Sequence, residues 1–276
     1  NREKAIIWMH GSGMNEKHCL KDSEYLREEG YSVLVLGFYF WKGMSKKMQG
    51  IPVDYVEKAV AELKNNGFNK IGIHGISSGA AYALLCASLI PDISLVLSIC
   101  PFDYVVEEPK IFGKPTGKSW FSYHGKDYPC SLFTGQREKG FLGSIRAYKK
   151  QDTEHQNEFL RSFYENATLT EGSRIRVENM RADVLFLAVK DDDCWPSDVA
   201  VPRMLQVLKD ANYPFRVESH IYEEGSHALS DGLDDMSGFP RWALRHMIPA
   251  EKRWPKECAE ARHDSFRRIL AFLEAW

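Results

Sequence analysis

Several features that would assign this chain to other classes of protein are missing from its 276 residues. No apolar run approaches the ~20 residues that a membrane-spanning helix requires, and the longest, Ala80–Ile90, is predicted to be a buried helix. Charges of both signs are interspersed and sum to −2, so no global field favours a nucleic acid or an anionic membrane as a partner. The first residues lead directly into an apolar run, and we therefore expect no signal peptide.

The six cysteines form no C-x-x-C pair and no group with histidine at metal-binding spacing. Several of them lie in apolar runs, which favours buried, reduced thiols and, from these, a cytoplasmic location. We predict neither a metal site nor a cofactor. Apolar residues make up 44% of the chain and charged residues 27%, which is the composition of an ordinary globular domain.

Short apolar runs alternate with helical patterns along most of the chain. Strands are predicted at residues 5–9, 32–36, 70–74, 93–99, 184–189 and 215–222, and helices at 16–29, 53–66, 78–90, 197–212 and 255–275. Continuous apolar strands separated by helices predict a doubly wound, mostly parallel sheet that is covered on both faces. The alternation stops between about residues 101 and 180, a stretch too long for a loop in a compact domain. We interpret it as an insertion, or lid, over one edge of the sheet, partly helical at about 153–164, within a single domain of residues 1–276.

The segment Gly75-Ile76-Ser77-Ser78-Gly79 lies between a predicted strand and a predicted helix. A strand, a sharp turn and a helix, with glycine two residues to either side of a serine, are typical of the nucleophile elbow of α/β hydrolases. The hydroxyl of Ser77 would stand at the N-terminus of the helix, where unpaired N–H groups favour developing negative charge. Ser78 is the rival nucleophile, but the glycines bracket Ser77 symmetrically. The structural alternative is a plain turn in which Ser77 only caps the helix.

Two backbone N–H groups are predicted to form an oxyanion hole. One belongs to Ser78, directly after the nucleophile. The other is expected from the loop His10–Met14, because this fold draws its second donor from the loop that follows the first of these strands. Ser12 or Gly13 is the predicted donor, and the sequence does not separate them. A glycine turn that binds no ligand is the alternative.

An acid and a base are predicted from the chain order of the triad in this fold, which is serine, acid, histidine. Three consecutive acids, Asp191, Asp192 and Asp193, follow the strand at 184–189, and His227 follows the strand at 215–222. The 35 residues from Asp192 to His227 leave room for one helix and one strand, which brings both loops to the same edge of the sheet. The rival histidines lie within predicted strands or helices: His74, His220, His246 and His263.

At this point the residues resemble the catalytic domain of acyl-CoA thioesterases and bile acid-CoA:amino acid N-acyltransferase. The resemblance covers most of the chain and is carried by Leu36–Phe40, Gly75–Ala80, Ser119-Trp120, Asp191-Asp192 with Trp195–Ser197, and Gly225–His227. In that family the second Asp of Asp-Asp-x-x-Trp-Pro-Ser is the triad acid, which selects Asp192. The larger members carry an N-terminal β-sandwich domain that helps shape the acyl-CoA site, and this sequence does not include it. The amino-acid-conjugating members use cysteine as nucleophile, so Ser77 implies transfer of the acyl group to water.

The predicted function is that of a serine hydrolase with Ser77 as nucleophile, His227 as base and Asp192 as acid. Its predicted partner is a small-molecule acyl thioester, acyl-CoA-like, or a small carboxylic ester. The alternatives are a peptidase or dienelactone-type hydrolase, and a non-catalytic binding module on the same fold. The oligomeric state is left open.

Two groups of residues are candidates for contact with the substrate. Trp120, Phe121 and Tyr123, in the insertion, are predicted to line an apolar acyl pocket, with packing of the insertion onto the core as the alternative. The second group follows the second strand and would meet a phosphate-bearing leaving group, or else form a solvated face: Lys42, Lys46 and Lys47.

Overall fold

A computed structural model describes residues 3–110, 114–135, 159–229 and 248–276, together with positions 142, 146, 238 and 242. Its main sheet has six strands in the order β2-β1-β4-β5-β8-β9, and every neighbouring pair is parallel. The strands are β1 (Lys4–Met9), β2 (Ser32–Leu36), β4 (Lys70–Ile76), β5 (Ile93–Ile99), β8 (Asp183–Val189) and β9 (Val217–Tyr222). The predicted strands agree with these bounds to within two residues at each end, and the doubly wound parallel sheet is confirmed.

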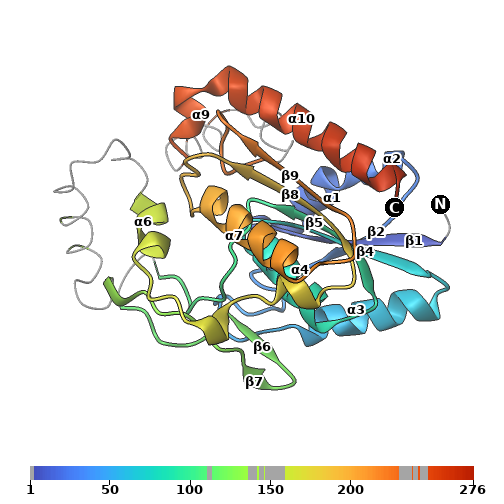
Figure 1. The fold of residues 1–276 in the computed structure, drawn as a ribbon, viewed down its shortest axis with the longest axis horizontal. Coiled ribbons are helices and arrows are strands. Elements are labelled where there is room, and N and C mark those ends of the chain that lie inside the picture. The colour runs from blue at the N-terminus through green and yellow to red at the C-terminus, as the bar shows by residue number, and fades with distance from the viewer. Residues whose placement is uncertain are drawn as a thin grey trace.

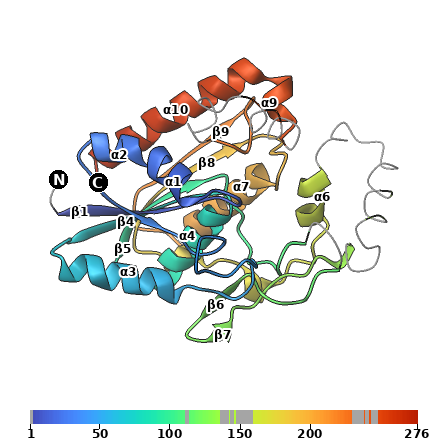
Figure 2. The same ribbon diagram turned by 180° about the vertical axis from the view of Figure 1, so that it is seen from behind.

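Helices cover both faces of this sheet (Figure 1, Figure 2). One face carries α3 (Asp54–Asn65), α4 (Ser78–Leu89) and α7 (Ser197–Asp210); the other carries α1 (Glu16–Asp22), α2 (Glu24–Glu28) and α10 (Pro255–Glu274). Each face has its own cluster of buried apolar side chains. Because the central strands are buried on both faces, they read as unbroken apolar runs in the sequence.

A second sheet of three short strands was not predicted. It consists of β3 (Ile51–Pro52), β6 (Phe121–Tyr123) and β7 (Lys126–Asp127), with β3 and β6 parallel and β6 and β7 antiparallel. The strands β6 and β7 belong to the stretch interpreted as an insertion. Strands this short carry no periodic pattern that separates them from a loop.

Two helix predictions differ from the structure. The helix expected at 16–29 is divided at Ser23, whose N–H closes α1 by bonding to the carbonyl of Cys19 at 3.1 Å. The helix expected at about 153–164 is seen as α6 (Phe159–Glu165), while residues 153–158 lie outside the described residues. The remaining elements are short: two 3₁₀ turns, η1 (Glu171–Ser173) and η2 (Val177–Asn179), and the helix α9 (Ala250–Arg253).

The parallel strands end at the edge of the sheet that faces away from the two chain termini. Figure 1 shows α6 and α9 at this end of the molecule. The loops that follow β4, β8 and β9 therefore meet there, as the sequence predicted. Within the described part of the chain, no helix has both the length and the apolar composition needed to cross a membrane.

Candidate active site

Ser77 joins β4 to α4 in a left-handed backbone conformation, with φ 56° and ψ −122°. Such a conformation costs about 1–3 kcal/mol for a residue other than glycine and is concentrated at functional sites. The turn is crowded as well. A Cβ on Gly75 would lie 2.1 Å from the carbonyl oxygen of Gly79, and a Cβ on Gly79 would lie 2.5 Å from that of His10. Both flanking positions therefore require glycine.

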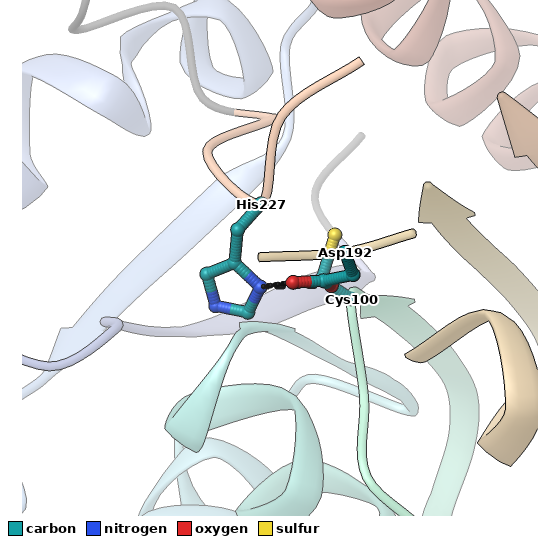
Figure 3. Close-up of side chains that lie close together, drawn as sticks. All are labelled: Cys100, Asp192 and His227. Carbon is teal, nitrogen blue, oxygen red and sulfur yellow. Dashed lines mark hydrogen bonds and ion pairs between the residues drawn. The ribbon is translucent and has the colours of Figure 1, made fainter. Parts of the chain in front are cut away.

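The side chains of Ser77, His227 and Asp192 form one line of hydrogen bonds. The hydroxyl of Ser77 does not cap α4 and lies 2.7 Å from Nε2 of His227. On the other side of the ring, Nδ1–H of His227 donates to the Asp192 carboxylate, at 2.8 Å to Oδ1 and 2.9 Å to Oδ2. Figure 3 shows the imidazole facing this carboxylate, with Cys100 beside it. The structure thus brings together the three side chains that the sequence placed at the ends of three different strands.

Asp192 differs from its two acidic neighbours in the number of hydrogen bonds that its side chain accepts. Its side chain is fully buried, and it accepts from Ser197 Oγ at 2.5 Å as well as from His227 and the two backbone N–H groups of residues 194 and 195. These four donors fix the position of the carboxylate. Asp193 instead accepts the N–H of Ala250 at 3.1 Å, and Asp191 is only partly buried.

The Asp192 carboxylate also raises the pKa of His227. Burial lowers the pKa of the imidazole, but attraction to the Asp192 carboxylate outweighs burial, and the pKa lies above its ordinary value of 6.5. Asp193 is nearby and buried, and burial together with the charge of Asp192 raises the pKa of its carboxyl to about 6. The groups around His227 therefore stabilise the protonated imidazole, which is the form that a general base takes once it has accepted a proton.

Three of the four rival histidines lie within strands or helices that the structure describes. His74 lies in β4 and stacks on Trp8 with ring centroids 5.3 Å apart, and burial lowers its pKa to about 3. His220 lies in β9 and His263 is exposed on α10. His246 lies outside the described residues.

The loop predicted to supply an oxyanion donor lies against the elbow. A Cβ on Gly11 would be 3.4 Å from the Cβ of Ser77, and the hydroxyl of Ser12 donates to that of Ser78 at 3.2 Å. Gly13 has a positive φ of 82°, which glycine adopts without strain. The structure brings the loop and the start of α4 together, and the assignment of donors to Ser78, Ser12 and Gly13 stays a prediction.

The contact of the Tyr39 hydroxyl with this region was missed by the sequence reasoning. The hydroxyl of Tyr39 lies 3.4 Å from that of Ser78, and the ring of Tyr39 contacts the ring of His10, with centroids 5.2 Å apart. His10 is buried against Phe38 and Tyr39, and burial lowers its pKa to about 4. The stretch Leu36–Phe40 was part of the family resemblance, but a hydroxyl contact across 39 positions leaves no periodic signal in the sequence.

The insertion reaches the loop of Asp192 through Arg161 of α6. This side chain donates to Asp198 Oδ1 at 2.8 Å and to the backbone carbonyl of Asp192 at 3.2 Å. The second oxygen of Asp198 accepts the N–H of Asp191 at 3.1 Å. A buried guanidinium thus connects the insertion, the start of α7 and the acid loop, and no sequence signal pointed to it.

Phe121 and Tyr123, predicted to line an acyl pocket, have other contacts. Phe121 is fully buried and stacks on Tyr82 of α4, with ring centroids 5.1 Å apart. The hydroxyl of Tyr123 donates to Glu57 Oε1 of α3 at 2.9 Å. Both contacts favour the alternative reading, in which these side chains pack the insertion onto the core.

Trp120 is buried too, but it belongs to an aromatic cluster that reaches the site. Its ring lies edge-on to Trp195 at 6.0 Å, and Trp195 lies edge-on to the imidazole of His227 at 5.7 Å. Trp120 therefore approaches His227 through Trp195, and its role in binding an acyl group stays a prediction.

Exposed lysines and several possible metal ligands occur among the described residues. The three lysines after β2 are exposed, and Lys46 Nζ donates to the carbonyl of Phe40 at 2.8 Å. Three groups of potential ligands within 4.8 Å of one another occur among the described residues: Cys100–Asp192–His227, Asp192–Asp193–Cys194 and Asp54–Glu57–His124. Two of them use the carboxylate that holds His227, and in the third His124 already bonds to Glu57 at 3.1 Å.

The sheet order and the hydroxyl, imidazole and carboxylate at its edge define an α/β hydrolase. Solved structures with this fold include an esterase of Pyrococcus furiosus, with a TM-score of 0.52 and 16% identity over 99% of this chain and 83% of that chain. Another is a puromycin-hydrolyzing peptidase of Mycobacterium tuberculosis, with a TM-score of 0.50 and 15% identity over 83% of this chain and 31% of that chain. Similarity at these identities establishes the fold alone.

The chain belongs to the family described as BAAT / Acyl-CoA thioester hydrolase C terminal, which matches residues 51–275. The resemblance stated from the motifs is thereby confirmed. The peroxisomal succinyl-coenzyme A thioesterase of Mus musculus is 26% identical over 173 residues, which are 62% of this chain and 36% of that protein. The match spans about a third of this curated relative's length.

Proposed function

We propose that the chain is a serine hydrolase that cleaves an acyl thioester, or a small carboxylic ester, through an acyl-enzyme on Ser77. The observation that carries the proposal is the hydrogen-bonded line from Ser77 through His227 to the buried Asp192. A serine hydroxyl is a weak nucleophile until a base accepts its proton, and this geometry supplies both the base and the acid that orients it.

The reaction follows from these contacts in two acyl transfers. Ser77 Oγ attacks the substrate carbonyl while His227 Nε2 accepts its proton, and Asp192 holds the imidazole tautomer and stabilises the imidazolium. The oxyanion accepts hydrogen bonds from the N–H of Ser78 and from that of Ser12 or Gly13. The thiol or alcohol leaves with the proton from His227. Water, deprotonated by His227, then releases the carboxylic acid and restores the Ser77 hydroxyl.

The family supports an acyl thioester as the substrate class, and the mouse relative is named for succinyl-coenzyme A. We propose an acyl thioester as the substrate class of this chain, but we do not propose the succinyl group. A serine nucleophile favours water as the acyl acceptor. We further propose that residues 1–276 form a single domain with 101–180 as its insertion. The cytoplasmic location stays a prediction, and the mouse relative is named as peroxisomal.

The test is an activity panel of acyl-CoAs, p-nitrophenyl esters and amino-acid anilides, with three proteins compared. Wild type should hydrolyse a thioester or an ester, and Ser77→Ala should lose about 10⁴-fold or more in kcat. Ser88→Ala is the matched control, because Ser88 is buried in the same helix and donates within it, to the carbonyl of Leu85 at 2.7 Å. It should retain wild-type activity.

Labelling by a fluorophosphonate, located by peptide mass spectrometry, reports on the nucleophile independently of the substrate. Label on Ser77 is expected. Near-full activity of Ser77→Ala, or an unlabelled Ser77 in a folded and inactive wild type, would refute the proposal and favour a binding module. Cleavage of anilides in preference to esters and thioesters would indicate a peptidase.

A further inference from the structure

Behind His227 lies a charged pair that the proposed reaction does not use. Glu251 of α9 and Arg262 of α10 are 5% and 1% exposed, and Arg262 Nη1 donates to Glu251 Oε1 at 2.6 Å. The same carboxylate oxygen accepts the hydroxyl of Ser226, the residue directly before His227, which is also buried. The loop that carries the base is therefore bonded to a buried carboxylate, and this carboxylate is paired with a buried guanidinium.

A second bond ties the same short helix to the loop of the acid. The N–H of Ala250 donates to Asp193 Oδ2 at 3.1 Å. Asp193 directly follows Asp192. Two consecutive residues of α9, Ala250 and Glu251, thus hold the chain neighbours of both the acid and the base. Figures 1 and 2 show α9 at the edge of the sheet where β8 and β9 end, next to the start of α10, and Trp254 alone separates the two helices.

The pair is difficult to explain by stability alone. Removing two charges from water costs several kcal/mol for each ion, and apolar residues of similar volume often replace a buried pair without loss. An apolar pair, however, offers no acceptor for the hydroxyl of Ser226. Glu251 supplies that acceptor, and Arg262 donates to the same carboxylate oxygen.

We propose that Glu251 and Arg262 are positioning residues, which act through Ser226 to hold His227 in line between Asp192 and Ser77. The inference rests on the proposed function, in which His227 must reach both the hydroxyl and the carboxylate at once. A displacement of about 1 Å at a reacting group can cost on the order of a hundredfold in rate. The pair belongs to α9 and α10, and it acts on the base without touching the substrate.

The central variant is Ser226→Ala, which removes the hydroxyl and leaves the Glu251–Arg262 pair intact. We expect kcat to fall between about tenfold and a hundredfold, with KM unchanged, because the reacting geometry is lost and substrate binding is not. The midpoint of the acidic limb of the pH–kcat profile should move to lower pH, because the imidazolium is held less firmly by Asp192. Ser265→Ala is the matched control: Ser265 is buried on α10 and donates to the carbonyl of Arg262 at 2.7 Å.

The pair itself is tested with Glu251→Met/Arg262→Met, in which neither charge is left unpaired. It should reproduce the loss in kcat of Ser226→Ala, and adding Ser226→Ala to it should cause no further loss, since all three changes break one linkage. Wild-type kcat and pH profile in Ser226→Ala would overturn the proposal, as would additive losses in the combined variant.

Proton NMR separates this inference from the proposed function. The hydrogen-bonded Nδ1–H of His227 should give a downfield signal in wild type that is retained in Ser265→Ala and weakened or shifted in Ser226→Ala. This readout needs no substrate. An unchanged signal in Ser226→Ala overturns the positioning role even if wild type hydrolyses nothing, whereas failure of the proposed function would appear as an inert wild type with Ser77 unlabelled.

Discussion

Among the three acids after β8, Asp192 is the one whose side chain meets a full set of donors. It is bonded to His227, to the Ser197 hydroxyl and to two backbone N–H groups. Replacement by asparagine keeps the volume but offers an N–H₂ group to the imidazole and stabilises the wrong tautomer. The role proposed for Asp192 therefore requires the charge of this carboxylate as well as its position.

We predict that Asp192→Asn lowers kcat by about 10⁴-fold. Asp191→Asn makes the same chemical change one residue away, on a side chain that is only partly buried, and should retain most of the activity. Steady-state kinetics on the best substrate of the panel, with circular dichroism to verify folding, would measure both. Equal losses in the two variants would contradict the assignment of the acid.

At the residue scale, some residues of the site were predicted from the sequence and others were missed, for a physical reason. The meeting of Ser77, Asp192 and His227 was predictable because each follows a recognisable strand, and parallel strands end at one edge of the sheet. Glu251 and Arg262 were not, because their roles arise from contacts made when α9 and α10 dock on the loops. Contacts of that kind depend on tertiary packing, and sequence periodicity reports only on the element that carries it.

At the scale of elements, the strands of the main sheet were predicted and those of the second sheet were missed. The six parallel strands were predicted because burial on both faces requires an unbroken apolar run. The sheet β3-β6-β7 was missed because its strands have two or three residues each, and because β3 pairs with β6 across about 70 positions of the chain. The residues of β7, Lys126 and Asp127, are both charged and exposed. From the sequence, such a pair resembles a turn more than a strand.

Arg161 is the contact through which α6 of the insertion can affect the acid loop. Its side chain is 9% exposed and its partner Asp198 is 14% exposed. Hydrogen bonds to Asp198 and Glu165 outweigh the effect of burial and raise the pKa of the guanidinium. Loss of this cation would leave Asp198 without its charged partner, beside the backbone of the triad acid.

We predict that Arg161→Met lowers the free energy of unfolding by about 3 kcal/mol and also lowers kcat. The control is Arg176→Met in the same insertion, because the pair of Arg176 with Glu171 is exposed at both ends, at 36% and 67%. An exposed pair contributes about 1 kcal/mol or less. Urea denaturation and kinetics would measure both variants, and an Arg161→Met protein as stable and active as Arg176→Met would refute the coupling.

At the scale of the whole molecule, the two apolar layers enclose histidines that are neutral in the folded state. Burial lowers the pKa of His74 to about 3 and that of His10 to about 4. Each unfolded imidazole has its ordinary value of about 6.5. Between these values the unfolded chain binds a proton that the folded core excludes, so the contribution of each histidine to stability is lost as the pH falls below 6.5. Asp193, with its raised pKa, acts in the opposite direction.

We therefore predict that His74→Phe, which cannot take up a proton, removes part of the acid sensitivity of the fold. The free energy of unfolding of wild type should fall relative to that of His74→Phe by about 3 kcal/mol between pH 6.5 and pH 4. The comparison cancels the opposing effect of Asp193, since both proteins contain it. His263→Phe changes an exposed histidine on α10 and should alter the unfolding free energy by less than about 0.5 kcal/mol at either pH. Urea titrations at the two pH values would measure these free energies. If the free energy of unfolding has the same pH dependence in wild type and His74→Phe, the core accepts the charged imidazole and the prediction is wrong.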